Sequence, residues 1–195
     1  MNLLAHLYLS GDFDEVMVGN LMADFVTGRI DDTLPAGIQT GMRLHREIDA
    51  YTDAHPLLRA GKQRLFPTYR HYAAVIMDVF YDHFLAVHWG QYHPLPLNDF
   101  AQRAYALLNE KIQLLPAAML PMTEAMSRQN WLVHYASVEG IDRALTGMAR
   151  RTRFVSGMEN ATDDLQRDYA FYEENFNNFF PDLVNHVREY RRNVE

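Results

Sequence analysis

Apolar residues recur at helical spacing along most of this chain, and no segment alternates between apolar and polar residues as a half-buried strand would. Proline residues punctuate the pattern, as at Pro35, Pro56 and Pro116. A chain of 195 residues is long enough to bury a core of its own. We therefore predict an all-α, single-domain helical bundle over residues 1–195.

The helix limits follow from the same pattern, with proline read as a start or a stop. Pro67 is expected to end one helix, and Pro181 is expected to open the last one. The predicted helices cover about 3–8, 14–28, 35–55, 57–66, 70–91, 98–115, 116–128, 138–151, 163–180 and 181–192.

Charge and composition exclude several classes of protein. The formal net charge of −7 disfavours general nucleic-acid binding, which needs a basic footprint. No apolar run reaches membrane-spanning length, and the first ten residues lack the basic start and cleavage site of a signal peptide. We therefore expect a cytoplasmic protein. Because there is no cysteine, any metal must be held by His, carboxylate, carbonyl or water, a set that suits Mn²⁺, Mg²⁺ or non-haem iron.

Two acids stand in the middle of the most apolar predicted helix. Asp78 and Asp82 are four residues apart, so their carboxylates leave the same helix face. Burying such acids is costly unless they are paired or bind a metal. His83 follows directly. These residues favour a metal or catalytic site, although the acids could instead mark a solvated face and His83 could be a core histidine.

A second group lies in the predicted helix 35–55. His45 and Asp49 are again four residues apart, so they could bind one ion, or the carboxylate could orient the imidazole. Arg46 beside them could hold an anionic oxygen such as that of a phosphate. A surface helix with ordinary ion pairs would look the same.

Two further polar residues stand alone in apolar segments. Asp24 follows Asn20 by one helical turn, and His6 lies within the apolar start of the chain. A lone His in such a segment is more often a core residue than a ligand. Together with the two groups above, however, they form a set of His and Asp on several helices, and helical bundles build metal sites in this way.

Basic residues gather at Arg150, Arg151 and Arg153, and again at Arg188, Arg191 and Arg192. A local basic patch can bind an acidic partner against the global charge. The ordinary explanation is a solvated helix end, where cations complement the helix dipole.

Several sequence blocks resemble the acyl carrier protein phosphodiesterase family, and they come in that family's order over nearly the whole chain. The blocks are Met1-Asn2-Leu3-Leu4-Ala5-His6-Leu7, Gly19-Asn20-Leu21-Met22-Ala23-Asp24-Phe25, His45-Arg46-x-Ile48-Asp49-x-x-Thr52-Asp53, Asp78-x-x-x-Asp82-His83-Phe84, Gln129-Asn130-Trp131-Leu132 and Gly147-Met148-Ala149-Arg150-Arg151.

The resemblance implies a fold, a reaction and a substrate. Family members hydrolyse the phosphodiester that joins 4′-phosphopantetheine to a serine of holo acyl carrier protein, use Mn²⁺ and are related to HD-type phosphohydrolases. HD enzymes bind metal through a His-Asp doublet, whereas this chain contains only Asp82-His83 in the reverse order. Individual ligands therefore cannot be carried over by motif.

The expected roles combine the residue patterns with this resemblance. Asp24, His45, Asp78 and Asp82 are expected to bind Mn²⁺, with Mg²⁺ and Fe²⁺ as alternatives. His83 is expected to act at the reacting bond, His6 and Asp49 to support the ligands, and Arg46 to hold a phosphate oxygen. Arg150, Arg151 and Arg153 are expected to dock the acidic carrier protein, with Lys62 and Arg64 as a second candidate.

Two other functions fit the same residues. One is an HD-like phosphohydrolase acting on a nucleotide, which a closed, nucleotide-sized pocket would favour. The other is a helical binding protein without catalysis, which would be favoured if the Asp and His residues lay on separate faces.

Overall fold

The computed structural model describes residues 1–194, and this part of the chain contains helices and no strand, which confirms the all-α prediction. Short 3₁₀ turns lie at Ala23–Phe25, Arg70–Tyr72, Ile112–Leu114 and Met158–Asn160. The α-helices are α1 (Leu3–Leu9), α2 (Glu15–Met22), α3 (Ala36–Ala54), α4 (Pro56–Tyr69), α5 (Ala73–Val87), α6 (Trp89–Tyr92), α7 (Leu97–Glu110), α8 (Leu120–Arg128), α9 (Trp131–His134), α10 (Val138–Ala149), α11 (Ala161–Arg167) and α12 (Tyr169–Val194).

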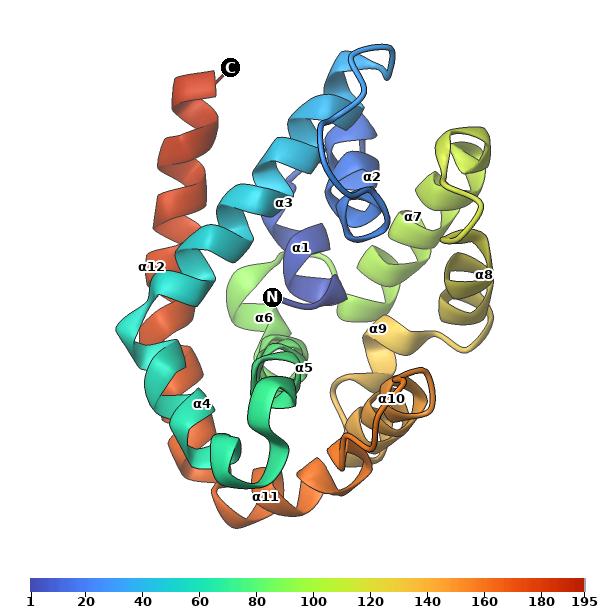
Figure 1. Cartoon of the computed structure of the whole chain (residues 1–195). Coiled ribbons are helices and arrows are strands. Elements are labelled where there is room, and N and C mark those ends of the chain that lie inside the picture. Colours follow the sequence, from blue (N-terminus) through green and yellow to red (C-terminus); the bar gives the residue numbers. More distant parts are fainter. Residues whose placement is uncertain (195) are drawn as a thin grey trace.

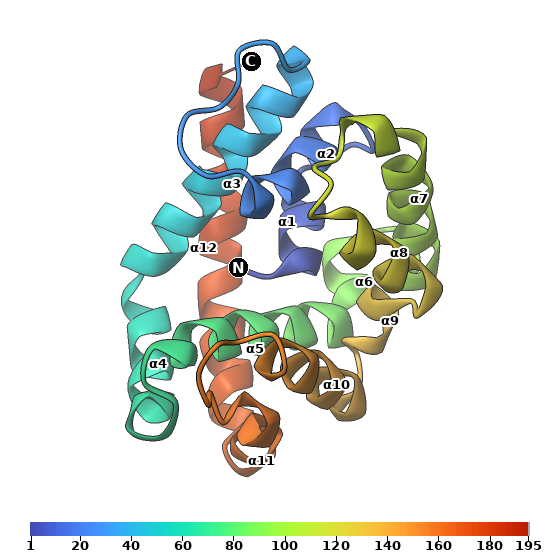
Figure 2. The ribbon, with the colours of Figure 1, turned by 45° about the vertical axis from the view of Figure 1, so that its right-hand side comes forward.

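Helix α1 lies at the centre of the arrangement. Figures 1 and 2 show it enclosed by α3, α5 and α12, with α7 to α10 on the opposite side from α12. Its apolar side chains are buried, and so are those of the middle of α5 and of the facing side of α12. Aromatic contacts join these last two helices, as between Phe80 and Tyr172 and between Tyr81 and Phe176. The short first helix therefore starts inside the molecule, where it can contribute to a site.

Two glycines let α2 and α3 touch along their backbones. A Cβ atom at Gly19 would lie 2.1 Å from the carbonyl oxygen of Ile38, and one at Gly41 would lie 2.0 Å from that of Val16. Both distances are far below any real contact, so only glycine allows this approach. The pairing fixes the spacing between the segment that follows α2 and the middle of α3.

The predicted helix end at Pro67 and the predicted helix start at Pro181 are both wrong, because both prolines lie inside helices. An interior proline removes one hydrogen bond and clashes with the preceding turn, at a cost of about 3 kcal/mol. Around Pro181, Phe179, Phe180 and Leu183 are all buried, so burial of apolar surface on both sides of the proline holds α12 together. Figure 1 shows α12 as one uninterrupted helix.

Within residues 1–194, no helix combines the length and the apolar character that crossing a membrane requires.

Candidate active site

Four side chains from three parts of the fold meet beside the start of α1. They are His6 on α1, His45 and Asp49 on α3, and Asp24 in the turn after α2. The ligand atoms of His6, His45 and Asp49 all lie within 4.8 Å of one another. Asp24 joins them through its Oδ1, 3.2 Å from Nε2 of His45. We call these four residues the His–Asp cluster. The structure thus brings together Asp24 and His45, predicted as metal ligands, with His6 and Asp49, predicted to support them.

The tautomer of His6 is fixed by Asn20, one helix away. Nδ1 of His6 lies 2.8 Å from the side-chain oxygen of Asn20, which can only accept a hydrogen bond, so Nδ1 carries the proton. The amide group of Asn20 is itself oriented, since it donates to the carbonyl of His6 and to the Ser10 hydroxyl. Burial lowers the pKa of His6, which keeps the ring neutral. The lone pair on Nε2 therefore faces Asp49, whose Oδ1 is 3.3 Å away.

His45 lies between two carboxylates. Its Nε2 is 3.1 Å from Oδ2 of Asp49 and 3.2 Å from Oδ1 of Asp24. Burial alone would lower the pKa of His45, but the two acids raise it to about 9. Burial would likewise raise the pKa of Asp49, yet the neighbouring His45 and His6 hold it well below its usual range. Without a metal, a proton on His45 holds the two acids together.

These residues fit a divalent cation. Nε2 of His6 is buried and has no hydrogen-bond partner within residues 1–194, although it faces a carboxylate. A buried lone pair of this kind costs free energy unless something binds it. Two imidazoles with two carboxylates are also the nitrogen and oxygen donors that Mn²⁺, Fe²⁺ or Mg²⁺ accept, and the orientation of His6 by Asn20 is typical of metal-binding histidines.

Asp82, predicted to bind metal, has another set of partners here. Its Oδ2 accepts a hydrogen bond from the backbone N–H of Leu4 at 2.7 Å, and its Oδ1 accepts one from that of Ala5 at 2.9 Å. These are the second and third residues of α1, and the side chain of its N-cap residue, Asn2, makes no capping hydrogen bond to the helix. Asp82 therefore caps the central helix from a position 78 residues away along the chain.

Asp78 contacts the N-terminal amino group, which in turn contacts Asp49 of the His–Asp cluster. Its Oδ1 is 3.5 Å from the buried α-amino group of Met1, which also lies 3.1 Å from Oδ1 of Asp49. Burial would lower the pKa of this ammonium group, but Asp78 and Asp49 raise it to about 10. Asp78 is thus linked to the cluster through the ammonium group of Met1. Its predicted role as a metal ligand, like that of Asp82, stays a prediction.

His83 and Arg46 point to other partners. Nδ1 of His83 lies 2.8 Å from the carbonyl of Tyr135, and Nε2 lies 3.0 Å from the Tyr169 hydroxyl, so both ring nitrogens already have a hydrogen-bond partner. Arg46 is exposed and donates to the carbonyl of Gly28 in the loop between α2 and α3. A catalytic His83 and a phosphate-holding Arg46 stay predictions that would need these contacts to change.

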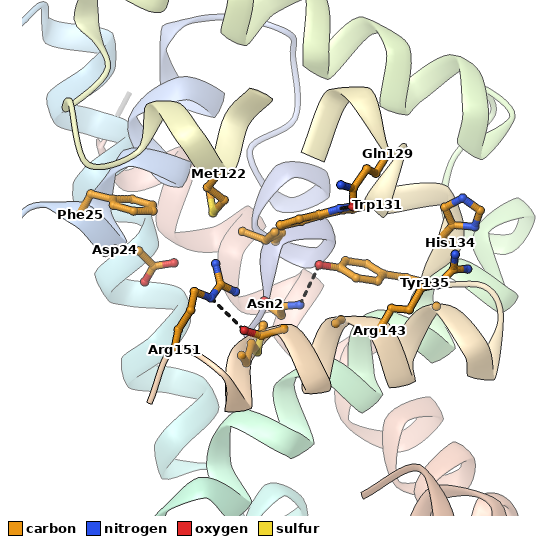
Figure 3. A pocket seen from close by; sticks show the side chains of 15 residues that line it. Asn2, Asp24, Phe25, Met122, Gln129, Trp131, His134, Tyr135, Arg143 and Arg151 are labelled. Carbon is orange, nitrogen blue, oxygen red and sulfur yellow. Dashed lines mark hydrogen bonds between the residues drawn. The ribbon is translucent and has the colours of Figure 1, made fainter. Parts of the chain in front are cut away.

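A cavity of about 320 Å³ adjoins the cluster at Asp24. Its walls are mostly apolar, and Figure 3 shows Phe25 and Met122 near Asp24, with Trp131 and Tyr135 further along. Its lining residues are Asn2, Leu3, Asp24, Phe25, Met122, Gln129, Trp131, His134, Tyr135, Gly140, Arg143, Ala144, Gly147, Met148 and Arg151.

Two arginines of the α10 region line this cavity. Arg151 follows the C-terminal end of α10 and lies on the same side of the cavity as Asp24, whereas Arg143 lies toward His134 (Figure 3). Arg150 and Arg153, the two others predicted to bind the partner, are exposed outside it. The apolar side chains of Phe154 and Val155 next to them are 70% and 96% exposed. Exposed basic and apolar groups therefore lie close to Arg151 along the chain, and Arg151 itself lines the cavity.

Sequence reasoning missed the importance of Asn20 and of the cavity walls. Asn20 is a polar residue in the apolar helix α2, as His6 is in α1, and the pairing of two isolated polar residues was a signal that they satisfy each other. The block Gln129-Asn130-Trp131-Leu132 carried only a resemblance, and the structure places its Gln129 and Trp131 in the cavity wall.

Comparisons with known proteins give one consistent answer. The family model described as acyl carrier protein phosphodiesterase matches residues 1–183. A protein of that name from Photorhabdus laumondii is 35% identical over 94% of this chain and 93% of its own length. Those from Enterobacter sp. strain 638 and Serratia proteamaculans are 34% and 32% identical, over 94% and 97% of this chain and 96% and 98% of their own lengths. No solved structure matches the chain. The resemblance seen in the sequence blocks is therefore confirmed, and the chain belongs to the acyl carrier protein phosphodiesterase family.

Proposed function

We propose that this protein hydrolyses the phosphodiester between 4′-phosphopantetheine and a serine of holo acyl carrier protein, giving the apo carrier and free 4′-phosphopantetheine. The observation that carries the proposal is the His–Asp cluster at the edge of a cavity, in a chain that matches the family over residues 1–183. The ester bond would be cleaved at the cluster, while the rest of the prosthetic group extends away from it.

The proposed metal ligands are His6, His45, Asp49 and Asp24. Mn²⁺ is the expected ion, with Mg²⁺ and Fe²⁺ as alternatives. The chemistry that such an ion supplies is screening of the phosphoryl oxygens and acidification of water near neutral pH. Asn20 holds the His6 ring so that Nε2 faces the site, and Asp49 lies close to both imidazoles. In this proposal His6 takes the place that the sequence suggested for Asp82.

The negative charge of the substrate has to be compensated around the ester as well. A phosphodiester is an anion, and it would otherwise be repelled by Asp24 and Asp49. Arg151 lines the cavity together with Asp24, which suits it to hold a phosphoryl oxygen through its planar fork of N–H donors. This role replaces the one expected of Arg46.

The carrier protein is proposed to dock on the rim formed by Arg150, Arg153 and the exposed Phe154. Acyl carrier proteins are acidic, and this chain has a net charge of −7, so productive contact requires local charge of the opposite sign. The rim offers that charge beside the cavity opening. A cytoplasmic location is part of the same proposal, and cell fractionation would test it.

The decisive experiment is incubation of holo acyl carrier protein with the purified protein and each divalent metal in turn, followed by intact-mass measurement of the carrier. We expect the carrier to lose the mass of the phosphopantetheine group with Mn²⁺ and to stay unchanged in EDTA. An Asp49→Asn variant should be inactive, and an Asp53→Asn variant, changed at an exposed acid on the same helix, should be active. An unchanged carrier mass with Mn²⁺, Mg²⁺ and Fe²⁺ would refute the proposal.

A further inference from the structure

The cavity beside Asp24 has the size and the lining of a binding site for a small ligand. Its volume of about 320 Å³ is that of a small-molecule site, since such sites span about 300–1,000 Å³. Most of its wall is apolar, and its polar groups come from Asn2, Asp24, Gln129, His134, the Tyr135 hydroxyl and the two arginines. Walls of this kind suit a neutral, flexible ligand that carries a few hydrogen-bonding groups.

The polar groups are unevenly distributed along the cavity. Asp24 and Arg151 lie at the end that joins the His–Asp cluster, so charged groups gather where a phosphodiester would react. Away from that end, the ring of Trp131 forms one wall, and its indole N–H donates to Gln129 at 3.0 Å. Asn2 donates weakly to the Tyr135 hydroxyl at 3.4 Å. These side chains are positioned by one another and can exchange such contacts for those of a ligand.

We propose that this cavity is the binding site for the pantetheine arm, with the phosphate at the Asp24–Arg151 end and the thiol end toward His134 and Arg143. The inference rests on the proposed function, which supplies the arm. The gem-dimethyl group and methylene chain of pantetheine match the apolar walls, and its two amides and hydroxyl match the few polar ones. Selection of the prosthetic group then depends on α9 and α10, and the metal residues act on any ester that is brought to them.

Gly147 provides a way to fill the cavity with little risk to the fold. It lies on α10 in the cavity wall, has no positive φ, and a Cβ atom built there meets nothing within 4 Å. Substitution by Ala, Leu and Phe therefore adds increasing volume to open space and removes a glycine that destabilises a helix. Gly90 on α6 is a matched control, because a Cβ there also meets nothing within 4 Å and the residue does not line the cavity.

The experiment measures binding and turnover separately. Pantetheine, which lacks the phosphate, is titrated into the metal-free protein while tryptophan fluorescence is recorded; the chain has two tryptophans, and Trp131 lines the cavity. We expect saturable quenching in the wild type and in Gly90→Phe. In the Gly147 series binding should weaken progressively, by at least about tenfold for Gly147→Phe, because even one methylene group changes binding in an apolar pocket by that order. The kcat/KM for holo carrier should fall in parallel.

The outcomes distinguish the two proposals. If the wild type binds pantetheine at Trp131 and leaves holo carrier intact with every metal, the arm site stands and the proposed activity fails. If holo carrier is cleaved and Gly147→Phe turns it over at the wild-type rate, the activity stands and the arm site is refuted. Unchanged pantetheine binding in a folded Gly147→Phe variant, checked by circular dichroism, refutes the arm site as well.

Discussion

The imidazole rings of His6 and His45 are stacked, with centroids 4.1 Å apart and planes inclined by 16°. They come from α1 and α3, and Asp49 contacts Nε2 of both rings. Two stacked rings would repel each other if both were charged. The low pKa of the buried His6 and the raised pKa of His45 resolve this conflict, because only His45 carries a proton when no metal is present.

Metal affinity should depend on Asn20, although Asn20 is not one of the four proposed ligands. Asn20→Ala removes the acceptor that holds the proton on Nδ1 of His6. Loss of such a partner weakens metal binding by about 10–100-fold. Titration with Mn²⁺, followed by electron paramagnetic resonance of the free ion, measures the change. Asn175→Ala is the control, because Asn175 is buried in a separate contact with Tyr81 and Leu57. Equal Mn²⁺ affinity in both variants would contradict the orientation of His6 by Asn20.

Asp82 should stabilise the protein even when metal is absent. Asp82→Ala leaves the buried N–H groups of Leu4 and Ala5 without an acceptor, at a cost of about 1–3 kcal/mol for each group left unsatisfied. Asp82→Asn should cost less, because the amide oxygen can still accept one of the two bonds. Urea unfolding in EDTA gives the free energy of unfolding. If Asp82→Ala were destabilising only in the presence of Mn²⁺, Asp82 would be acting as a ligand and the capping role would fall.

The contribution of His83 to stability should fall in mild acid. Burial lowers the pKa of His83 below 6.5, and its Nε2 accepts a hydrogen bond from Tyr169 only in the neutral form. The imidazole therefore takes up a proton in the unfolded chain first, and the contribution of His83 to stability is lost as the pH falls below about 6.5, by up to about 1.4 kcal/mol per pH unit. Unfolding free energies at pH 7.5 and 5.5 test this in metal-free buffer. His83→Gln should show a smaller difference between the two pH values than the wild type, and an equal difference would exclude His83 as the cause.

Charge reversal on the cavity rim should change association with the carrier and leave the chemistry intact. In the double variant Arg150→Glu, Arg153→Glu, we expect KM to rise, kcat to stay near the wild-type value, and the fall of kcat/KM with ionic strength to weaken. Arg59→Glu reverses an exposed charge on α4, a helix that contributes no residue to the cavity wall, and should behave like the wild type. If the double variant kept the wild-type KM and salt dependence, the arginines would be an ordinary solvated helix end.

Local patterns predicted most of the fold. The helical spacing of apolar residues gave the all-α class, and Ser137 and Asp14 accept backbone hydrogen bonds at helix starts near the expected positions. Pro67 and Pro181 misled the prediction, because a local rule about proline ignores the buried side chains on either side. Tertiary packing decides such cases, and it cannot be read from a window of sequence.

The candidate site was predicted only in part, because it too depends on tertiary packing. Spacing of four residues joins His45 to Asp49 correctly, because both lie on one helix. The same spacing joins Asp78 to Asp82, yet Asp82 caps α1 and the structure brings His6 to the cluster instead. Whether a carboxylate meets a metal or a helix end depends on which distant helix packs against it, and spacing along the chain carries no information on that point.

The contact between α2 and α3 has a consequence for motion. Gly19 and Gly41 bring the two backbones together so closely that neither helix can slide or rotate past the other without a clash. Asp24 and His45 are attached to these two helices, so that half of the cluster moves as one rigid body. Admission of a long substrate then has to come from the opposite wall, where α10 ends in an exposed loop. Opening and closing of the enzyme should accordingly appear in amide exchange around residues 150–156, with the amides of α2 and α3 among the slowest in the protein.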